Sequence, residues 1–502
     1  MYKRQGDVIA EIANYPENGN WAPHLHFQIM LSTLNYKIDF PGVCYYNQIE
    51  VWKDLCPNPN LLFKSVELNY TNDKSDGELI NYRKKHLGKS LKLHYEEPIN
   101  IVRGEGVYLI SKNGRKYLDT INNVAHVGHE NESVVIEGQS QMSILNTNSR
   151  YLHKSINELA KEIIQTLPKK LNVIHFVNSG SEANELAVRM MKSHTGSNDI
   201  IVSENGYHGN TNICVDISSY KFDGKGGKGA PKNTHVIPMP TKFNGKYKGE
   251  EACEGYISEI KNSIKNLKSK NRDLGGFIIE PIISCGGQVE LPDGFLKTAY
   301  DLIRENGGIC ISDEVQVGCG RLGESFWGFE LHDVIPDIIT IGKPLGNGHP
   351  IGAVVCTSEI AESFANGMEF FNTFGGNPVS CSIATQVLKV VKNENLQKNA
   401  KTIGNYFKNE LKNISDKYDI IGDVRGQGLF LGIEFIDHKM NPLFKETKYI
   451  VNRLKDFGIL ASLDGPNNNV IKIKPPLIFN KDNCDTFIFY LHKILEEDFL
   501  NK

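Results

Sequence analysis

The feature that most constrains the fold is an alternation, from about residue 100 onward, of short apolar runs with segments of helical pattern. The apolar runs lie at residues 174–177, 200–202, 236–237, 277–279, 309–311, 338–341 and 352–355. Short continuous apolar strands between helices are typical of a parallel sheet that is covered on both faces. We therefore predict an α/β fold with a mostly parallel sheet in a large domain.

The two ends of the chain follow different patterns. Helical segments near 382–396 and 446–457 accompany a strand at 429–435, which predicts a smaller α+β domain. Residues 1–55 show short strand patterns separated by turn signals, and a polar, proline-bearing stretch follows them. The predicted organisation is a short β-rich segment over 1–55, a linker and the first part of the small domain over 56–125, the large domain over 126–385 and the rest of the small domain over 386–502.

Charge and cysteine usage exclude several classes of protein. The 56 basic and 59 acidic residues give a net charge of −3, which does not support a general nucleic-acid or anionic-membrane binder. No apolar run approaches the roughly 18 residues that span a bilayer. The ten cysteines include no Cys-x-x-Cys pair, which argues against a disulfide framework or structural zinc. We expect a cytoplasmic protein with neither nucleic-acid nor membrane partners.

The first candidate site residues lie where a predicted strand turns into a helix, at Ser179, Gly180 and Ser181. A small, flexible turn at a helix N-terminus exposes backbone N–H groups that can bind a phosphate. Taken alone, the same residues fit an N-capped helix after any buried strand.

Three further motifs also follow predicted strands. Asp313 could keep a pyridine nitrogen protonated, and Lys343, flanked by glycines, could form a Schiff base with an aldehyde. Tyr207, followed by His208, could stack on a planar ring. Each has a simpler interpretation, namely a surface acidic turn, a solvated loop lysine and a core aromatic. Together with the phosphate-binding turn they match pyridoxal phosphate (PLP), which requires all four groups.

The chain from about residue 95 to its C-terminus resembles the class III aminotransferase family, PLP enzymes of fold type I. The resemblance is strongest at Glu280-Pro281, 311–318, Gly320-Arg321 and 342–344. It implies that Lys343 is the catalytic lysine that holds the cofactor and that Asp313 pairs with the ring nitrogen. It also implies a set of cofactor-binding residues: Ser179, Gly180, Ser181, Tyr207, His208, Glu280, Gln316 and Thr373. Because the matching threonine reaches the phosphate of the neighbouring subunit, Thr373 implies a homodimer.

A shorter stretch, Ser-Cys-Gly-Gly-Gln at 284–288, resembles the amino-alcohol phosphate phospho-lyases of that family, although Ile283 stands where a glutamine is expected. Other members carry at position 285 a glutamate that pairs with an arginine, here matched by Arg425. With Cys285 at that place, Arg425 is expected to offer a free guanidinium to a substrate phosphate or carboxylate, unless it only stabilises a turn.

The same resemblance covers 146–153, which adds Arg150 and Tyr151 to the substrate-binding candidates. Lys474 ranks last because a solvated strand lysine is the simpler interpretation. The predicted function is a phospho-lyase that eliminates phosphate and ammonia from an amino-alcohol phosphate such as ethanolamine phosphate. The alternative is a transaminase that moves an amino group from an amine or ω-amino acid to a keto acid.

Residues 18–28 resemble the last strand of an M23 zinc peptidase domain. His24 and His26 would share one face of that strand, but a zinc site needs at least three protein ligands. The upstream ligands of the family are absent from residues 1–23. We therefore predict a vestigial motif with no working metal site, in the tail of a fused peptidase-like module that is either degenerate or cut by a misplaced start.

Overall fold

The computed structural model describes residues 75–500, so the M23-like segment with His24 and His26 lies outside the described residues. The chain divides into two compact units, residues 1–94 and 95–502. In the first unit the structure describes helix α3 (Asp76–His86). Ser75 and Glu78 form a capping box at its start, which satisfies backbone N–H groups that the first turn leaves free.

The second unit is built on a seven-stranded sheet. Its order is β4 (Val173–Val177), β12 (Gly352–Cys356), β11 (Ile338–Ile341), β10 (Ile309–Asp313), β7 (Leu274–Ile279), β5 (Asp199–Ser203) and β6 (Thr234–Ile237). Neighbouring strands are parallel except that β12 runs antiparallel to both β11 and β4. The seven apolar runs are therefore all strands, and the prediction of a mostly parallel sheet is confirmed.

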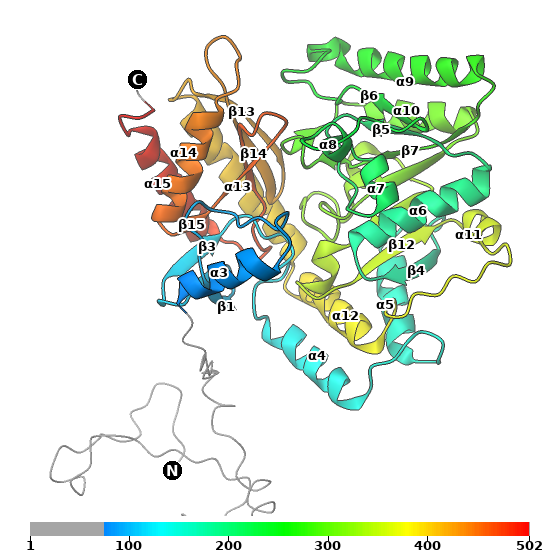
Figure 1. Cartoon of the computed structure of the whole chain (residues 1–502), viewed down its shortest axis with the longest axis horizontal. Helices are drawn as coiled ribbons and strands as arrows, with labels where there is room; N and C mark the ends of the chain where they lie inside the picture. The colour runs from blue at the N-terminus through cyan, green and yellow to red at the C-terminus, as the bar shows by residue number, and fades with distance from the viewer. Residues whose placement is uncertain (1–74, 501–502) are drawn as a thin grey trace, which may run out of the picture. The chain divides into compact units, whose positions relative to one another are not determined.

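Alternate side chains of these strands enter two separate cores. Ile200 and Val202 pack with helices α6 (Gly180–Thr195) and α11 (Ser358–Phe364), whereas Ile201 packs in the core on the other face. Helices α9 (Ala252–Ser269) and α10 (Phe295–Glu305) cover that second face (Figure 1). Because both faces are covered, the strands are apolar throughout rather than alternating.

The C-terminal region forms a smaller antiparallel sheet with its own helices. The sheet order is β13 (Ile421–Gln427), β14 (Phe430–Phe435), β17 (Val470–Ile473) and β16 (Ser462–Asp464). Its helices are α13 (Leu396–Ser415), α14 (Phe444–Asp456) and α15 (Lys481–Leu495). The helix predicted near 382–396 is α12 (Pro378–Asn393), which ends just before α13 begins.

A third sheet joins an early segment to this region. Strands β1 (Ile101–Glu105), β2 (Tyr108–Ser111) and β3 (Lys116–Asp119) form antiparallel pairs, and β3 pairs in parallel with β15 (Ile459–Leu460). Between residues 75 and 500 the remaining elements are four helices, a hairpin and three short 3₁₀ helices. These are α4 (Glu132–Ile144), α5 (Lys154–Ile164), α7 (Asn212–Asp216), α8 (Ser219–Phe222), the hairpin β8 (Ile282–Ile283) and β9 (Val289–Glu290), and the 3₁₀ helices at Gly249–Glu251, Gly328–His332 and Lys343–Gly346. The sequence-based domain limits stay a prediction.

A buried arginine connects the large sheet to the C-terminal region. Arg321 Nη1 donates to the carbonyl oxygens of Leu429, at 3.0 Å, and Pro475, at 2.8 Å. His126 lies beside it, with Nε2 2.7 Å from the carbonyl oxygen of Cys319. Burial lowers the pKa of His126 to about 3, and the charge of Arg321 acts in the same direction.

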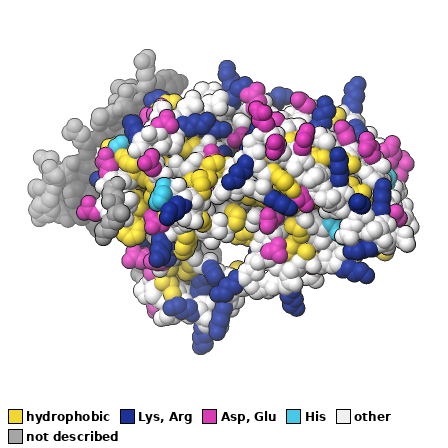
Figure 2. Space-filling view, turned by 90° about the horizontal axis from the view of Figure 1, so that it is seen from above, with side chains coloured by type: hydrophobic (Ala, Val, Ile, Leu, Met, Phe, Trp, Pro, Cys, Tyr) yellow, Lys and Arg dark blue, Asp and Glu magenta, His cyan; other side chains and the backbone are white. Residues whose placement is uncertain are grey.

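On the face shown in Figure 2, Lys and Arg side chains are interspersed with Asp and Glu, as the small net charge suggests. Of the helices between residues 75 and 500, none is long and apolar enough to cross a membrane.

Candidate active site

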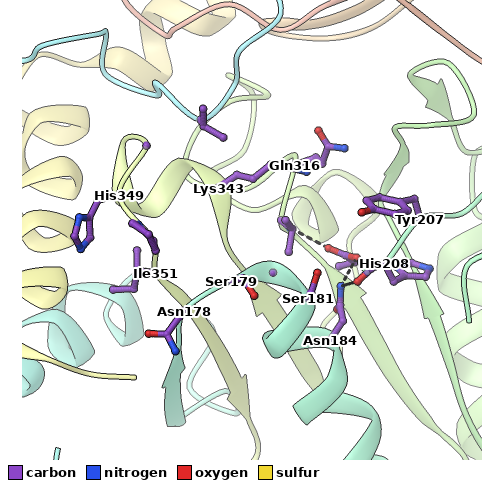
Figure 3. A pocket seen from close by; sticks show the side chains of 17 residues that line it. Asn178, Ser179, Ser181, Asn184, Tyr207, His208, Gln316, Lys343, His349 and Ile351 are labelled. Carbon is purple, nitrogen blue, oxygen red and sulfur yellow. Dashed lines mark hydrogen bonds and ion pairs between the residues drawn. The ribbon is translucent and has the colours of Figure 1, made fainter. Parts of the chain in front are cut away.

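Four of the predicted motifs meet at one edge of the large sheet. β4 leads to Ser179, β5 to Tyr207, β10 to Asp313 and β11 to Lys343. Because these strands all run in one direction, their carboxyl ends lie at the same edge, where α/β folds bind ligands. The motifs enclose a cavity of about 300 Å³ (Figure 3).

Asp313, at the end of β10, is buried and held from three sides. Its Oδ2 lies 2.8 Å from His208 Nδ1 and 2.8 Å from Asn184 Nδ2, and its Oδ1 accepts from the backbone N–H of Val315. These contacts fix the direction of the carboxylate. Sequence reasoning missed Asn184, although its place four residues after Gly180 on α6 puts both on the same helix face.

Lys343 lines the same cavity as Asp313. Its backbone φ is +24°, a conformation that residues with side chains rarely adopt, and such strain is typical of functional sites. Within residues 75–500 no hydrogen bond or ion pair engages its Nζ. Burial lowers the pKa of Lys343, which favours the neutral amine needed in a nucleophile or base.

The start of α6 forms the floor of the cavity, as Figure 3 shows for Ser179 and Ser181. Ser179 caps the helix by accepting from the N–H of Glu182, and Ser181 Oγ accepts from the N–H of Asn210. A Cβ at Gly180 would lie 2.7 Å from a methyl group of Val315, so the close approach requires glycine. The free N–H groups and the helix dipole favour an anion here.

Tyr207 and Glu280 are linked on one side of the cavity. Glu280 accepts from the backbone N–H of Tyr207 and from both the N–H and the hydroxyl of Ser284. Burial raises the pKa of Glu280, and the charge of Asp313 adds to this. Burial also raises the pKa of the Tyr207 hydroxyl to about 12, so it stays protonated at neutral pH.

Gln316 is held by a network that fixes its amide. Its Oε1 accepts from Asn123 Nδ2 at 3.0 Å and from Lys474 Nζ at 2.9 Å, and its Nε2 donates to Ser284 Oγ at 2.8 Å. Both acceptor positions on Oε1 are thus taken, which directs the NH₂ group toward Ser284 and leaves one N–H for a ligand.

Six predicted site residues do not line this cavity, and three of these, Thr373, Tyr151 and Arg150, are exposed. Tyr151 is 68 % exposed. Arg150 is also exposed, with Nη2 2.9 Å from Glu369 Oε1 and its guanidinium 3.8 Å from the ring centre of Phe371. Their predicted roles therefore depend on a second subunit.

The expectation that Arg425 offers a free guanidinium is wrong. Its Nη1 contacts Asp423, at 2.9 Å, and Glu434, at 2.5 Å, and its Nε donates to the carbonyl oxygen of Gly287. Arg425 also lines a different cavity, which Lys343 does not reach. Asp423 on β13 and Glu434 on β14 therefore take the place of the glutamate that position 285 lacks.

The structure also places three other residues at this end of the site. Ile283 faces the hydrophobic core, so it does not set the polarity of the cavity. Burial raises the pKa of the Cys285 thiol to about 12, which keeps it neutral. The interpretation of Lys474 as a solvated strand lysine is wrong, because its side chain is buried against Gln316.

These groups fit PLP. The cavity joins a buried amine that has no partner among residues 75–500, a carboxylate held by three donors and a helix N-terminus that suits a phosphate. His208 Nε2 has no hydrogen-bond partner among residues 75–500, and a Cβ at Gly209 would lie 2.6 Å from Ser181 Oγ. Tyr207, His208 and Gly209 all line the cavity, so an aromatic face and a close backbone approach are available to a ring bound there. The fold and the site together define a PLP-dependent enzyme of fold type I.

Comparison with known proteins identifies the family. The aminotransferase class-III model matches residues 92–495, and the chain belongs to this family of PLP-dependent enzymes. A Drosophila melanogaster protein named alanine–glyoxylate aminotransferase 2-like is 44 % identical over 431 residues, covering 84 % of this chain and 87 % of the relative. A Caenorhabditis elegans protein named ethanolamine-phosphate phospho-lyase homolog 1 is 36 % identical over 440 residues, covering 84 % and 94 %.

Among solved structures, a phospholyase from Arthrobacter in complex with phosphoethanolamine is similar to this chain with a TM-score of 0.80 and 35 % identity. The match covers 83 % of this chain and 99 % of the Arthrobacter protein. Both reaction types that the sequence left open thus occur among the names of its relatives.

Proposed function

We propose that the protein is a PLP-dependent phospho-lyase that converts an amino-alcohol phosphate, such as ethanolamine phosphate, with water to an aldehyde, ammonia and inorganic phosphate. The observation that carries this proposal is the single cavity that joins Lys343, Asp313 and the N-terminus of α6. The phosphoethanolamine complex of the Arthrobacter relative supports the substrate class.

Each group has a role in this proposal. The N-terminus of α6 with Ser179, Gly180 and Ser181 would hold the cofactor phosphate, and Tyr207 would pack on the ring. Asp313, oriented by His208 and Asn184, would hold the proton on the ring nitrogen, and Gln316 would donate to the 3′-oxygen. Bound in this way, PLP supplies an electron sink for charge that develops on the carbon next to the substrate amine.

Lys343 is the proposed catalytic base. Its amine would hold the cofactor aldehyde until the substrate amine takes its place. Burial lowers the pKa of Lys343, which favours the neutral amine that can accept a proton from the carbon next to the substrate nitrogen. The C–O bond on the adjacent carbon then breaks, and phosphate leaves with the electron pair.

A transaminase is the second candidate, because the Drosophila relative carries an aminotransferase name. A transaminase must also bind the carboxylate of a keto acid, for which an arginine is well suited. Between residues 75 and 500 no arginine lines the Lys343 cavity, and Arg425 is occupied by Asp423 and Glu434. This arrangement favours the phospho-lyase.

We further propose that the protein is a homodimer. Exposed apolar side chains gather on α4 and on two loops, at Val135, Ile136, Met142, Ile144, Leu152, Met368 and Phe374. The contacts of Arg150 with Glu369 and Phe371 place the two loops side by side. A large exposed apolar patch marks an interface, and Thr373 lies within it. A cytoplasmic location stays a prediction.

The decisive experiment incubates the purified holoenzyme with ethanolamine phosphate and no keto acid. We expect equal amounts of inorganic phosphate and acetaldehyde. A parallel reaction supplies alanine and glyoxylate and measures glycine and pyruvate. Phosphate release that strictly requires a keto acid, or amino transfer without any phosphate release, would contradict the phospho-lyase.

A further inference from the structure

Two lysines at the end of β17 form a buried basic pair. Lys472 and Lys474 are two residues apart along an extended segment, so their side chains point to the same face. Lys474 is 5 % exposed and the side chain of Lys472 is 23 % exposed. Lysine is rarely buried to this degree unless it has a partner.

The pair has too little negative charge around it. Lys474 Nζ donates to the neutral Gln316 Oε1, and none of the carboxylates between residues 75 and 500 forms an ion pair with it. Lys472 Nζ lies 3.6 Å from Asp464 Oδ2, which also accepts from Gln288 Nε2. Asp464 therefore pairs with Lys472 and influences Lys474 only from a greater distance. Burial lowers the pKa of Lys474 to about 7, and the charge of Lys472 contributes.

The excess positive charge lies next to Gln316, at the edge of the cavity that Lys343 lines. Gln316, the partner of Lys474, lines the cavity together with Lys343, and Figure 3 shows the two side by side. Lys343 is close enough to Lys474 to influence its pKa, and Lys472 is close enough to influence that of Lys343. Cys285 is also close enough to influence the pKa of Lys343 and that of Lys474, and its own thiol is neutral.

The other cations considered for substrate binding are engaged elsewhere. Arg425 is paired with two carboxylates in a separate cavity, and Arg150 is exposed beside Glu369. A phosphate on the carbon next to the reacting carbon has to lie near the end of Lys343. The basic pair is the group of cations at that place that lacks a full countercharge.

We propose that Lys472 and Lys474 form the subsite that binds the phosphate group of the amine substrate. This inference rests on the proposed function for the presence of that phosphate. A phosphate dianion would supply the missing countercharge through charge-assisted hydrogen bonds from both Nζ atoms. The subsite would also select against amines that lack the phosphate, because these leave the buried charge unpaired.

The test uses inorganic phosphate, a product of the proposed reaction, as a calorimetric probe of the holoenzyme. In the holoenzyme the cofactor phosphate occupies the N-terminus of α6, so the probe reports on another site. We expect Lys474→Met and Lys472→Met each to weaken phosphate binding about tenfold or more, because each removes a charged donor. Lys474→Arg, which keeps the charge, should bind phosphate within about threefold of the parent.

The matched control is Lys448→Met, a half-exposed lysine paired with Glu96 on the surface, which should bind phosphate like the parent. The visible cofactor spectrum checks that each variant folds. A merely structural role for Lys474 predicts that Lys474→Met weakens unphosphorylated ethanolamine as much as phosphate. That result, or unchanged phosphate affinity in both methionine variants, would overturn the subsite.

Failure of the inference and failure of the proposed function give different results. If the parent enzyme releases no phosphate from ethanolamine phosphate, the proposed function fails, whatever the phosphate titration shows. If the parent is an active lyase and both methionine variants keep its KM for ethanolamine phosphate, the subsite fails alone. The expected result is a KM raised about tenfold or more, with a smaller change in kcat.

Discussion

His208 Nδ1 lies 2.8 Å from Asp313 Oδ2, although the two residues belong to segments that follow different strands of the large sheet. The contact is buried, and Asn184 donates to the same carboxylate oxygen. It orients the carboxylate toward the cavity before any ligand binds. In the proposed enzyme His208 is therefore a positioning residue for Asp313.

Replacing His208 by alanine should weaken PLP binding about tenfold, because a hydrogen bond to a charged group contributes roughly 1.5–3 kcal/mol. Fluorescence titration of the apoenzyme with PLP measures the change. His194→Ala, a surface histidine that contacts Ser363, is the control. Equal affinities of His208→Ala and the parent would show that Asp313 does not need this contact.

Lys343→Ala should abolish the visible absorbance of the lysine-bound cofactor. Borohydride reduction followed by mass spectrometry of peptides should label Lys343 in the parent and no lysine in the variant. Lys221→Ala, which removes a lysine 5.4 Å from the ring centre of Tyr207, should keep the label on Lys343. A label on any other lysine would refute the site.

Phe374→Glu should convert the proposed dimer into monomers, because it places a charge within the exposed apolar patch. Phe374 is 68 % exposed, and Phe489 on α15, 63 % exposed, provides the matched control Phe489→Glu. Sedimentation velocity at micromolar concentration should show Phe374→Glu at half the parent mass and Phe489→Glu at the parent mass. The monomer should also bind PLP more weakly, because Thr373 would no longer reach a partner site.

Acidification should destabilise the protein through His126. Its folded pKa of about 3 lies below the unfolded value near 6.5, so between these values the unfolded chain binds more protons. The free energy of unfolding should therefore fall as the pH drops from 6.5 toward 3, by up to about 1.4 kcal/mol per pH unit from this residue. His126→Gln, which can still donate to the carbonyl oxygen of Cys319, should show a shallower slope in urea titrations. The same slope in parent and variant would contradict this assignment.

The sequence predicted the large sheet because its strands are continuous apolar runs such as Ile338–Ile341, which only a doubly covered sheet accommodates. It predicted the place of Asp313 and Lys343 for a related reason, since residues that follow parallel strands meet at one edge. These features depend on short stretches of chain, so local pattern is sufficient.

Long-range contacts decided what the sequence could not show. Gln316 and Lys474 are 158 positions apart, and only the contact between the segments that follow β10 and β17 makes the lysine a buried partner of the amide. Glu434 meets Arg425 because β13 and β14 pair in one register, with Arg425 opposite Gly432. A sequence motif that lacks a glutamate at position 285 cannot reveal that a neighbouring strand provides another.

The antiparallel strand β12 has a consequence for the order of events during synthesis. Every backbone hydrogen bond that ties β4 to the rest of its sheet runs through β12, which is translated after Lys343. The turn between β4 and α6 and the amine of Lys343, which follows β11, therefore reach a fixed distance from each other only when β12 has inserted between β4 and β11. A ribosome-bound chain that stops short of β12 should not retain the vitamin B6 derivative, so capture of this molecule belongs to the final stage of folding.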